Sequence, residues 1–324
     1  MGFKTALKSV AATPAGWRAA SFVRPPGVIV LTYHRVSRPG DRFPGLPIEG
    51  FREQMQWVSA RCRPIAPEQL QEGAGEPRAG RPAVLVTFDD GYLSYRRDAY
   101  PILKDLGIPA LVFLATAYID DPTRLFWWDA LRAAILTSPR DRVELPWSPG
   151  TVTPLGDRGT RERLLRAAKD HLKGVESDTH DAEVAEFVER LGISERALRV
   201  EREMMDWSDV KSTTDLTRFG GHTHTHPILS MVPDDRLEAE IATCRNRVAS
   251  ATGAPPRFFA YPNGRSRDFD ERSRGVLRRH GFDVAFSTEE GVNGPDADWM
   301  AVRRFAGEGS LHDLAWRLLD RSRR

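Results

Sequence analysis

Short apolar runs recur along the chain and predict a parallel β-sheet. Each run is rich in Val, Ile, Leu or Phe and is bounded by Gly, Pro or charged residues, as in strands that are buried on both faces. Between the runs, apolar residues recur three or four positions apart and predict helices, and a repeated strand–helix order is typical of the α/β class. The predicted strands are residues 28–33, 84–88, 110–115, 219–221, 258–261 and 284–287, and the predicted helices include 51–61, 95–106 and 234–252. Residues 120–205 interrupt this order and predict a mainly helical insertion, with helical patterns from Arg161 to Glu203.

Polar or titratable residues follow four of these predicted strands. In an α/β barrel the active site is built at the C-terminal ends of the strands, so this placement favours a barrel with one site. The residues concerned are His34, the pair Asp89 and Asp90, the histidines at 222, 224 and 226, and the turn 262–264.

Composition narrows the possible functions. The 324 residues carry a net charge of +2, which provides no field to recruit nucleic acid, so we expect no nucleic-acid partner. The two cysteines, Cys62 and Cys244, exclude a disulfide framework and a cysteine-rich zinc module, and they fit a reducing cytosol. No run approaches the ~20 apolar residues of a transmembrane helix. We expect residues 1–27 to be a leader that docks on the domain of a cytoplasmic protein, with a weak interfacial helix at the membrane as the alternative.

Asp89 and Asp90 form the first candidate constellation. Two adjacent carboxylates cannot both be buried and charged without a nearby cation. Successive side chains of an extended segment point in opposite directions, so one carboxylate could bind a metal while the other takes a proton. Gly91 lets the chain turn sharply behind them. An ordinary acidic turn, with Asp as a helix N-cap, is the alternative.

Three of the eight histidines lie within five residues, at His222, His224 and His226. On a helical turn, the first and third would share a face and chelate one metal, and one carboxylate would complete a catalytic zinc site with an open position for water. Cobalt, nickel or iron would also accept these ligands. Thr223 and Thr225 are placed to cap the turn or anchor ring nitrogens. An extended segment would instead direct all three rings the same way, and a solvated turn or core histidines would bind no metal.

These residues carry a resemblance. The segments Thr87-Phe88-Asp89-Asp90-Gly91 and His222-Thr223-x-x-His226-Pro227 are similar to the first two motifs of the polysaccharide deacetylase family, also called carbohydrate esterase family 4 or the NodB-homology domain. Residues 258–264 resemble the third motif in its variant without arginine. Residues 30–36 resemble the opening of members that modify bacterial exopolysaccharides. The resemblance spans roughly residues 28–305, and the first two motifs together are specific.

The resemblance implies a distorted (β/α) TIM-like barrel and a hydrolase that acts on a linear amide, removing acetyl groups from N-acetylated carbohydrate. By motif, Asp90, His222 and His226 match the metal ligands, with zinc as the expected metal, and Asp89 matches the general base. The domain organisation we expect is the leader 1–27, a deacetylase barrel over 28–305 with its insertion, and a basic C-terminal helix over 306–324.

Two positions depart from the usual family pattern. The family's third-motif arginine, which orients the base, is replaced by Ala260, and Arg265 or Arg304 is a candidate substitute. The general acid matches His34 in the exopolysaccharide-type members, whereas the usual layout takes it from a late Leu-x-His-like motif. His312 is the late candidate here; we favour His34 because it follows a strand.

Two aromatic features allow more than one interpretation. Tyr261, beside Pro262 and Asn263 at the rim, is a candidate substrate-binding residue that either stacks on a sugar or packs in the core. The cluster at residues 126–129 either packs the insertion onto the body or forms a platform for a sugar ring; we favour packing.

Two other functions remain open from the sequence. An amidohydrolase-type metal hydrolase would use the extended His-x-His geometry, but it would need further histidines at later strand ends. A non-catalytic carbohydrate-binding homologue would be consistent with the missing arginine.

Overall fold

The computed structural model describes residues 13, 27–74, 81–175, 177–199 and 202–319. The predicted leader, apart from residues 13 and 27, and the last five residues of the predicted C-terminal helix lie outside the described residues. No described helix has both the length and the apolar character needed to cross a membrane.

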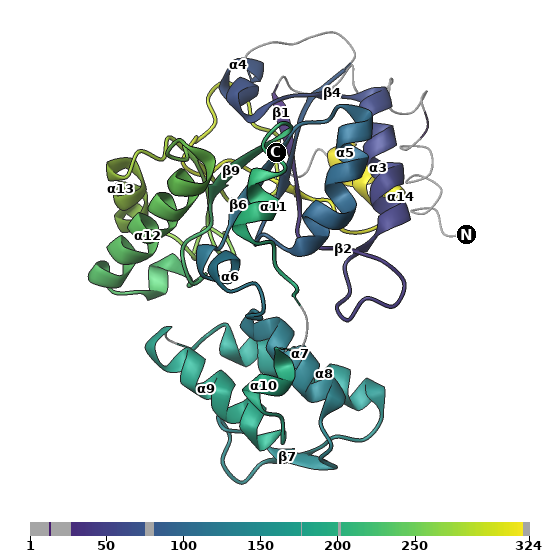
Figure 1. Cartoon of the computed structure of the whole chain (residues 1–324), viewed down its shortest axis with the longest axis vertical. Helices are drawn as coiled ribbons and strands as arrows, with labels where there is room; N and C mark the ends of the chain where they lie inside the picture. The colour runs from purple at the N-terminus through teal and green to yellow at the C-terminus, as the bar shows by residue number, and fades with distance from the viewer. Residues whose placement is uncertain (1–12, 14–26, 75–80, 176, 200–201, 320–324) are drawn as a thin grey trace.

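The body is built on a parallel sheet that curls into a half-barrel (Figure 1). The six predicted strands are present, and the strand order is β11-β10-β9-β6-β5-β1-β12, with β4 paired to β5 off this path. Their bounds are β1 Val28–Tyr33, β4 Arg63–Pro64, β5 Ala83–Phe88, β6 Ala110–Leu114, β9 Thr217–Gly221, β10 Phe258–Ala260, β11 Val284–Phe286 and β12 Phe305–Ala306.

The strand register brings the predicted site residues together. β1 and β5 pair along their full lengths, up to Tyr33 opposite Phe88, so the next residues along both strands, His34 and Asp89, emerge side by side. β6 and β9 pair up to Leu114 opposite Gly221, directly before His222. The site therefore lies at the carboxyl ends of adjacent strands, as the barrel prediction requires.

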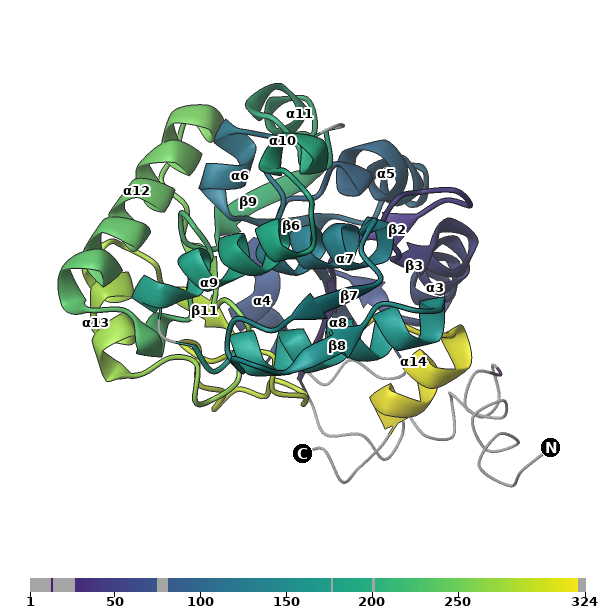
Figure 2. The same cartoon turned by 90° about the horizontal axis from the view of Figure 1, so that it is seen from below.

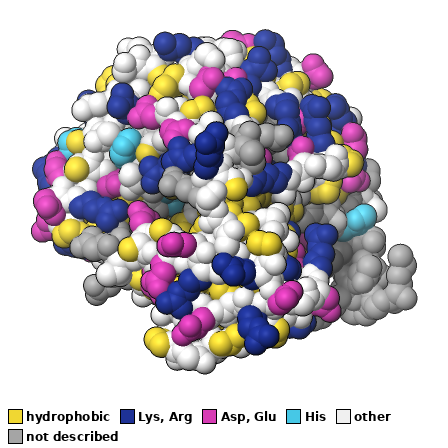
Figure 3. Space-filling model, turned by 60° about the horizontal axis from the view of Figure 1, so that its bottom comes forward, with side chains coloured by type: hydrophobic (Ala, Val, Ile, Leu, Met, Phe, Trp, Pro, Cys, Tyr) yellow, Lys and Arg dark blue, Asp and Glu magenta, His cyan; other side chains and the backbone are white. Residues whose placement is uncertain are grey.

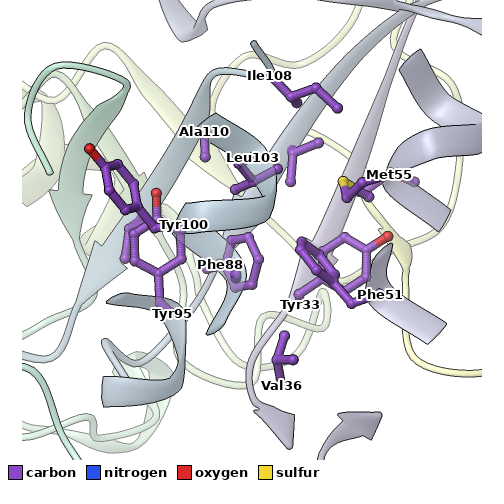
Figure 4. Close-up of a cluster of buried hydrophobic side chains, with 14 of the residues drawn as sticks. Tyr33, Val36, Phe51, Met55, Phe88, Tyr95, Tyr100, Leu103, Ile108 and Ala110 are labelled. Atoms are coloured by element: carbon purple, nitrogen blue, oxygen red, sulfur yellow. The ribbon is translucent and has the colours of Figure 1, made fainter. Parts of the chain in front are cut away.

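Helices cover the outer face of the sheet and bury its apolar side chains. Between α3 (Ile48–Arg61), α5 (Tyr100–Leu106) and the sheet, four aromatic rings pack edge to face or tilted, with centroids 4.8–5.7 Å apart (Figure 4). They belong to Tyr33, Phe51, Phe88 and Tyr95. The longest predicted helix, 234–252, is found with those bounds as α12. The helices of the body are α3 Ile48–Arg61, α4 Leu70–Gly73, α5 Tyr100–Leu106 with a π-helical turn at Tyr95–Ala99 before it, α6 Thr116–Asp120, α11 Trp207–Lys211, α12 Asp234–Thr252, α13 Glu271–Arg279 and α14 Leu311–Leu319. Two-residue strands β2 (Val36–Ser37) and β3 (Leu46–Pro47) pair beside α3.

The insertion forms a separate helical lobe at one end of the body (Figures 1 and 2). It has an apolar core of its own, centred on residues such as Leu131, Leu164 and Phe187. Its helices are α7 Trp127–Thr137, α8 Arg158–Leu172, α9 Ser177–Arg190 and α10 Glu195–Leu198, and an antiparallel pair, β7 Arg142–Glu144 with β8 Val152–Pro154, was not predicted.

A buried arginine ties the lobe to the body. The Arg35 side chain, which follows His34, lies over the Tyr92 ring at 4.0 Å and donates to Asp129 at 2.9 Å. Tyr92 donates to the same carboxylate at 3.0 Å. Because Asp129 belongs to the first turn of α7, this contact fixes the start of the lobe beside the strand ends.

Candidate active site

Asp90, His222 and His226 form a compact cluster of metal-ligand atoms. One carboxylate oxygen and two imidazole nitrogens lie within 4.8 Å of one another. The Nε2 atoms of His222 and His226 are 3.4 and 3.5 Å from Asp90 Oδ1. All three side chains are buried, at 8% exposure or less. The spacing leaves room for one cation between the three donors.

Hydrogen bonds and burial set these histidines up as neutral ligands. Nδ1–H of His222 donates to the carbonyl oxygen of Ala260 at 2.7 Å, which leaves the Nε2 lone pair directed to the cluster. Burial is the largest cause that lowers the pKa of His226, which falls to about 3. A neutral imidazole is the form that binds a metal.

The turn that presents the two histidines is not helical, in contrast to the predicted helical turn. Thr223 and His226 have left-handed φ angles of 63° and 65°. The Thr223 hydroxyl accepts the backbone N–H of His226 at 2.9 Å and donates to the His222 carbonyl at 2.6 Å. Left-handed residues other than glycine are costly and cluster at functional sites, so this hydroxyl stabilises a strained turn.

Glu240, from α12, supports the same turn. Its carboxylate accepts the backbone N–H groups of His224 and Thr225 at 2.8 and 2.7 Å, and it also binds the Thr225 hydroxyl. It was not predicted as a site residue, because it appears in the sequence as one acidic position of an amphipathic helix.

His224 lies outside the cluster. Its Nδ1 is hydrogen-bonded with the Thr116 hydroxyl at 2.9 Å. The three histidine rings therefore do not point the same way. The extended geometry that the amidohydrolase alternative requires is not found.

Asp89 and Asp90 face different partners, as expected for adjacent residues at a strand end. Asp90 has a left-handed φ of 74°, and Gly91, with φ 87°, follows it. A Cβ at Gly91 would lie 2.8 Å from the Ile119 side chain, so the sharp turn behind the carboxylates needs glycine.

Arg304 holds the Asp89 carboxylate in a bidentate ion pair. Its Nη1 and Nη2 donate to Oδ1 and Oδ2 at 2.7 and 2.8 Å, and its Nε donates to the Ser287 carbonyl at 2.8 Å. Burial raises the pKa of Asp89, but the charge and the hydrogen bonds of Arg304 oppose burial, and this pKa lies below its ordinary value. Of the two arginines that the sequence offered, Arg304 is the one that contacts Asp89. Arg265 is exposed.

His34 stands beside Asp89 and is oriented by Glu308. Its Nδ1 is hydrogen-bonded to Glu308 Oε1 at 2.8 Å, and its Nε2 lies 3.9 Å from Asp89 Oδ2. Burial lowers the pKa of His34, but the hydrogen bond and charge of Glu308, together with the charges of Asp90 and Asp89, outweigh burial and raise it to about 10. His34 is therefore an imidazolium at neutral pH, with one N–H directed toward the site.

The sequence did not single out Glu308, and it favoured His34 as the acid but kept His312 as the alternative. Glu308 comes two residues after β12, so it follows the same strand-end rule, but a two-residue strand has no recognisable pattern. His312 lies exposed in the first turn of α14. Among the described residues, no hydrogen bond, ion pair or ring contact joins it to the cluster.

Of the three predicted rim residues, Tyr261 and Pro262 are buried and Asn263 is exposed. The Tyr261 ring stacks on Phe269 at 3.9 Å, and its hydroxyl donates to the Met300 carbonyl at 2.9 Å. Tyr261 is 1% exposed, so the structure places it in the core, the second of its two predicted positions, and Pro262 is buried beside it. Asn263, in contrast, is exposed and lines a cavity next to the cluster.

That cavity, of about 610 Å³, lies between the body and the insertion. His226 lines it together with Trp127 and Trp128. Phe126 is fully buried and stacks between Tyr118 and Trp128 at 3.8 and 4.4 Å, so this ring packs the lobe onto the body. The aromatic cluster therefore has a packing member and two cavity-lining members.

The donor set fits a borderline divalent metal. Two neutral imidazoles and one carboxylate, buried and without a fourth protein donor in the described cluster, match the three-ligand form of a catalytic zinc site. These ligands do not distinguish zinc from cobalt, nickel or iron.

Fold and site together define a half-barrel protein with a buried two-histidine, one-carboxylate centre at its strand ends. The sequence model of the family "Polysaccharide deacetylase" matches residues 76–147 and 197–285, on either side of α8 and α9. The chain belongs to this polysaccharide deacetylase family.

Similarity to individual proteins agrees with this membership. The chain is 30% identical over 103 residues to a poly-beta-1,6-N-acetyl-D-glucosamine N-deacetylase of Escherichia coli, a match that covers 30% of this chain and 15% of that protein. The solved structure of the Streptococcus pyogenes deacetylase PplD in complex with acetate aligns with 91% of this chain and 99% of its own, at 14% identity and a TM-score of 0.59. IcaB from Ammonifex degensii aligns with 92% of this chain and 99% of its own, at 20% identity and a TM-score of 0.58. The two structural likenesses show the fold.

Proposed function

We propose that this protein is a metal-dependent hydrolase that removes acetyl groups from N-acetylated sugars of a polysaccharide or oligosaccharide. One observation carries the proposal: directly after Asp89 in the chain comes Asp90 of the Asp90–His222–His226 cluster, and Asp89, held by Arg304, lies 3.9 Å from the His34 ring, which is held by Glu308. Hydrolysis of an amide needs a base that takes a proton from the attacking water and an acid that protonates the leaving nitrogen. The similarity to the E. coli deacetylase and the family membership support the substrate class.

Asp90, His222 and His226 would hold the metal, and we propose zinc. A divalent cation there would polarise the acetyl carbonyl and lower the pKa of water toward ~7. The protein's own contribution begins at Asp89, whose carboxylate would accept the proton of the attacking water. The ion pair with Arg304 keeps this carboxylate anionic and fixes its orientation, so its lone pairs are aimed before substrate arrives.

His34 would donate the second proton. When the C–N bond breaks, the leaving nitrogen needs a proton, and Nε2–H of the His34 imidazolium is the donor next to Asp89. Glu308 holds Nδ1–H and so fixes the ring orientation. Asp89 is buried directly after β5, and His34, which is 43% exposed, directly follows β1, so both groups stand on rigid strand ends.

The non-catalytic alternative loses the observation that favoured it. It rested on the missing third-motif arginine, and Arg304, directly before β12, supplies a guanidinium to Asp89. The amidohydrolase alternative requires the histidine rings to point the same way, and the His224 ring is instead hydrogen-bonded to Thr116.

The decisive experiment combines metal analysis of the purified protein with acetate release from N-acetyl and O-acetyl sugars, each with and without a chelator. We expect about one equivalent of metal and chelator-sensitive release of acetate from N-acetyl substrates. Sugar binding without chelator-sensitive release would instead identify a non-catalytic protein. Release from O-acetyl sugars alone would identify an esterase.

A further inference from the structure

The cavity of about 610 Å³ between the insertion and the body has a mixed lining, in which aromatic and aliphatic side chains lie beside polar and charged ones. Of the charged lining residues that the structure describes, four are basic and two are acidic: Arg124, Lys173, Arg199 and Arg236, against Asp181 and Glu189. Basic and acidic side chains are mixed over the face seen in Figure 3, so no single sign of charge dominates it. Selection of a charged ligand must therefore depend on individual side chains inside the cavity.

Arg124, in the segment between α6 and α7, is half-buried in this lining. Its guanidinium lies over the Tyr118 ring at 5.0 Å. No hydrogen bond or ion pair joins that guanidinium to any residue in the part of the chain that the structure describes. Arg199, in contrast, is exposed and forms an ion pair with Asp121. Because removing a charge from water is costly unless an opposite charge meets it, Arg124 points to a negatively charged ligand.

A stack of aromatic rings connects Arg124 with the metal cluster. Tyr118, beneath the guanidinium, stacks on Phe126 at 3.8 Å, and the Phe126 ring contacts the His226 ring edge to face at 5.3 Å. Two rings therefore separate the guanidinium from the metal ligand. An anion bound to Arg124 would belong to the unit next to the reacting sugar and not to the amide that is cleaved.

Two further aromatic rings lie between these points. Trp127 and Trp128 are half-buried and line the same cavity. Trp128 contacts the His226 ring at 5.1 Å, and its Nε1–H donates to the Tyr92 hydroxyl at 3.1 Å, which fixes the ring. An aromatic wall with a few placed polar groups is suited to bind a ring and to orient it by its polar substituents.

We propose that the cavity binds the unit next to the N-acetylated sugar, and that this unit carries an anionic group, a carboxylate or a phosphate, which pairs with Arg124. The inference rests on the proposed function and adds no chemical step to it. The bond that is cleaved remains the amide of the N-acetyl group.

Asp181 of α9 is the carboxylate with which such a ligand would compete. The hydrogen bond of His180 is the largest cause that lowers the pKa of Asp181, and the charge of Arg124 also lowers it. The Asp181 side chain is 76% exposed, and its carboxylate contacts His180 at 3.3 Å. Solvent screens an exposed charge, so a ligand anion inside the cavity would pair with Arg124 more strongly than Asp181 does.

The first test compares disaccharides of N-acetylglucosamine and glucuronic acid, in both linkage orders, with their methyl esters. The ester keeps the ring and removes only the charge. We expect kcat/KM for acetate release to be about tenfold higher for the acid than for the ester, as for a hydrogen bond to a charged group, and this ratio should fall as salt is added.

A phosphate arm identifies the source of the anion. N-acetylglucosamine 1-(methyl phosphate) is compared with the methyl glycoside of N-acetylglucosamine, which is neutral. A gain for the phosphodiester but none for the acidic disaccharides would assign the site to a glycosyl phosphate, and the reverse would assign it to an acidic sugar. Equal rates for every charged substrate and its neutral counterpart would overturn the proposal.

Three variants test the role of the charge. Arg124→Gln should bring the ratio of charged to neutral kcat/KM to about one, because the pairing cation is lost. Asp181→Asn removes the competing carboxylate and should raise the ratio. Arg166→Gln, at an exposed arginine of α8 outside the lining, should keep the wild-type ratio. An unchanged ratio in Arg124→Gln would refute the assignment.

Binding of the deacetylated products separates the two proposals. Calorimetry with glucuronyl-glucosamine and its methyl ester requires no turnover. If acetate is released but neither the rate nor the Kd depends on the charged group, the anion site fails and the proposed function stands. If no acetate is released but the acid binds more tightly than the ester, and Arg124→Gln abolishes this difference, the proposed function fails and the anion site stands.

Discussion

Arg304 and Asp89 are 215 residues apart in the chain and form a buried bidentate ion pair, with N···O distances of 2.7 and 2.8 Å. Arg304 follows Arg303 just before β12, and Asp89 follows β5; β1 lies between these two strands in the sheet. The family's usual arginine position is occupied by Ala260, whose carbonyl instead orients His222. The guanidinium that holds Asp89 in this chain therefore comes from the residue directly before β12.

Replacing Arg304 should damage both activity and stability. Arg304→Gln leaves a buried carboxylate without its cation, which costs roughly 3–5 kcal/mol in the free energy of unfolding. It also raises the pKa of Asp89, because the charge that lowers this pKa is lost. The acidic limb of the kcat/KM profile should therefore move to higher pH. A pH–rate profile with the metal content measured in parallel tests this, and Arg265→Gln, at an exposed arginine, is the control. An unchanged acidic limb would contradict the role.

Variants of the two metal-binding histidines should lose metal, whereas a variant of the neighbouring histidine should keep it. His222→Ala or His226→Ala removes one of three donors, so we expect loss of bound metal and of activity. His224→Ala should retain metal, because the His224 ring binds Thr116. Elemental analysis of the three purified variants checks this. Complete metal loss in His224→Ala would contradict the geometry of the turn.

Replacing Asp90 should affect metal binding, whereas replacing Asp89 should affect the rate of reaction. Asp90→Asn removes a ligand charge and should lower metal affinity. Asp89→Asn should keep the metal and lower kcat by the ~10²–10⁴ that a general base contributes. Metal titration beside steady-state kinetics measures both effects, and equal metal loss in both variants would refute the division of roles.

The acid should be His34 and its support Glu308. His34→Gln should lose most turnover with metal retained, whereas His312→Ala, at an exposed residue, should stay within a few-fold of the wild type. If His312→Ala were inactive while His34→Gln remained active, the general acid would be His312 instead of His34.

Glu308→Gln tests the pKa of the same group. The pKa of His34 is raised to about 10 in the metal-free protein, and a bound cation repels the proton, so the alkaline limb of the loaded enzyme lies below that value. Glu308→Gln removes the hydrogen-bonded charge that raises this pKa, so the alkaline limb should move further down in pH. The His34–Glu308 pair contributes stability that is fully present below pH ~6.5, the pKa of His34 in the unfolded chain. This stability is lost as pH rises through the pKa of His34 in the folded protein. Thermal unfolding of the metal-free protein should show this loss in the wild type but not in Glu308→Gln.

Glu240 should matter for metal affinity although it touches no metal ligand atom. Glu240→Gln weakens the acceptor of two backbone N–H groups in the turn 222–226. Removing such supporting contacts typically lowers metal affinity 10–100-fold. Competition with a chromogenic chelator measures this, with Glu238→Gln of the same helix as the control. Equal affinities in both variants would show that the turn holds its shape without Glu240.

The amino-acid pattern predicted the main strands, the longest helix and the residues of the candidate site. Buried parallel strands are continuous apolar runs, so all six were recognisable, and α12 was predicted with its observed bounds. Asp89, Asp90, His222 and His226 were recognisable because strand ends concentrate chemistry in this fold class and because their spacing is local.

The contacts that hold those residues in place came from the folded chain and not from any local pattern. Arg304 and Glu308 meet Asp89 and His34 across 215 and 274 residues, and no local periodicity encodes such a contact. The turn at 222–226 is left-handed at two positions because Glu240 and the Thr223 hydroxyl stabilise it, which propensity alone would not favour. The cavity likewise exists only where the insertion meets the body. Local patterns specify which side chains are available, whereas long-range packing specifies their partners, because a partner is chosen by distance in space.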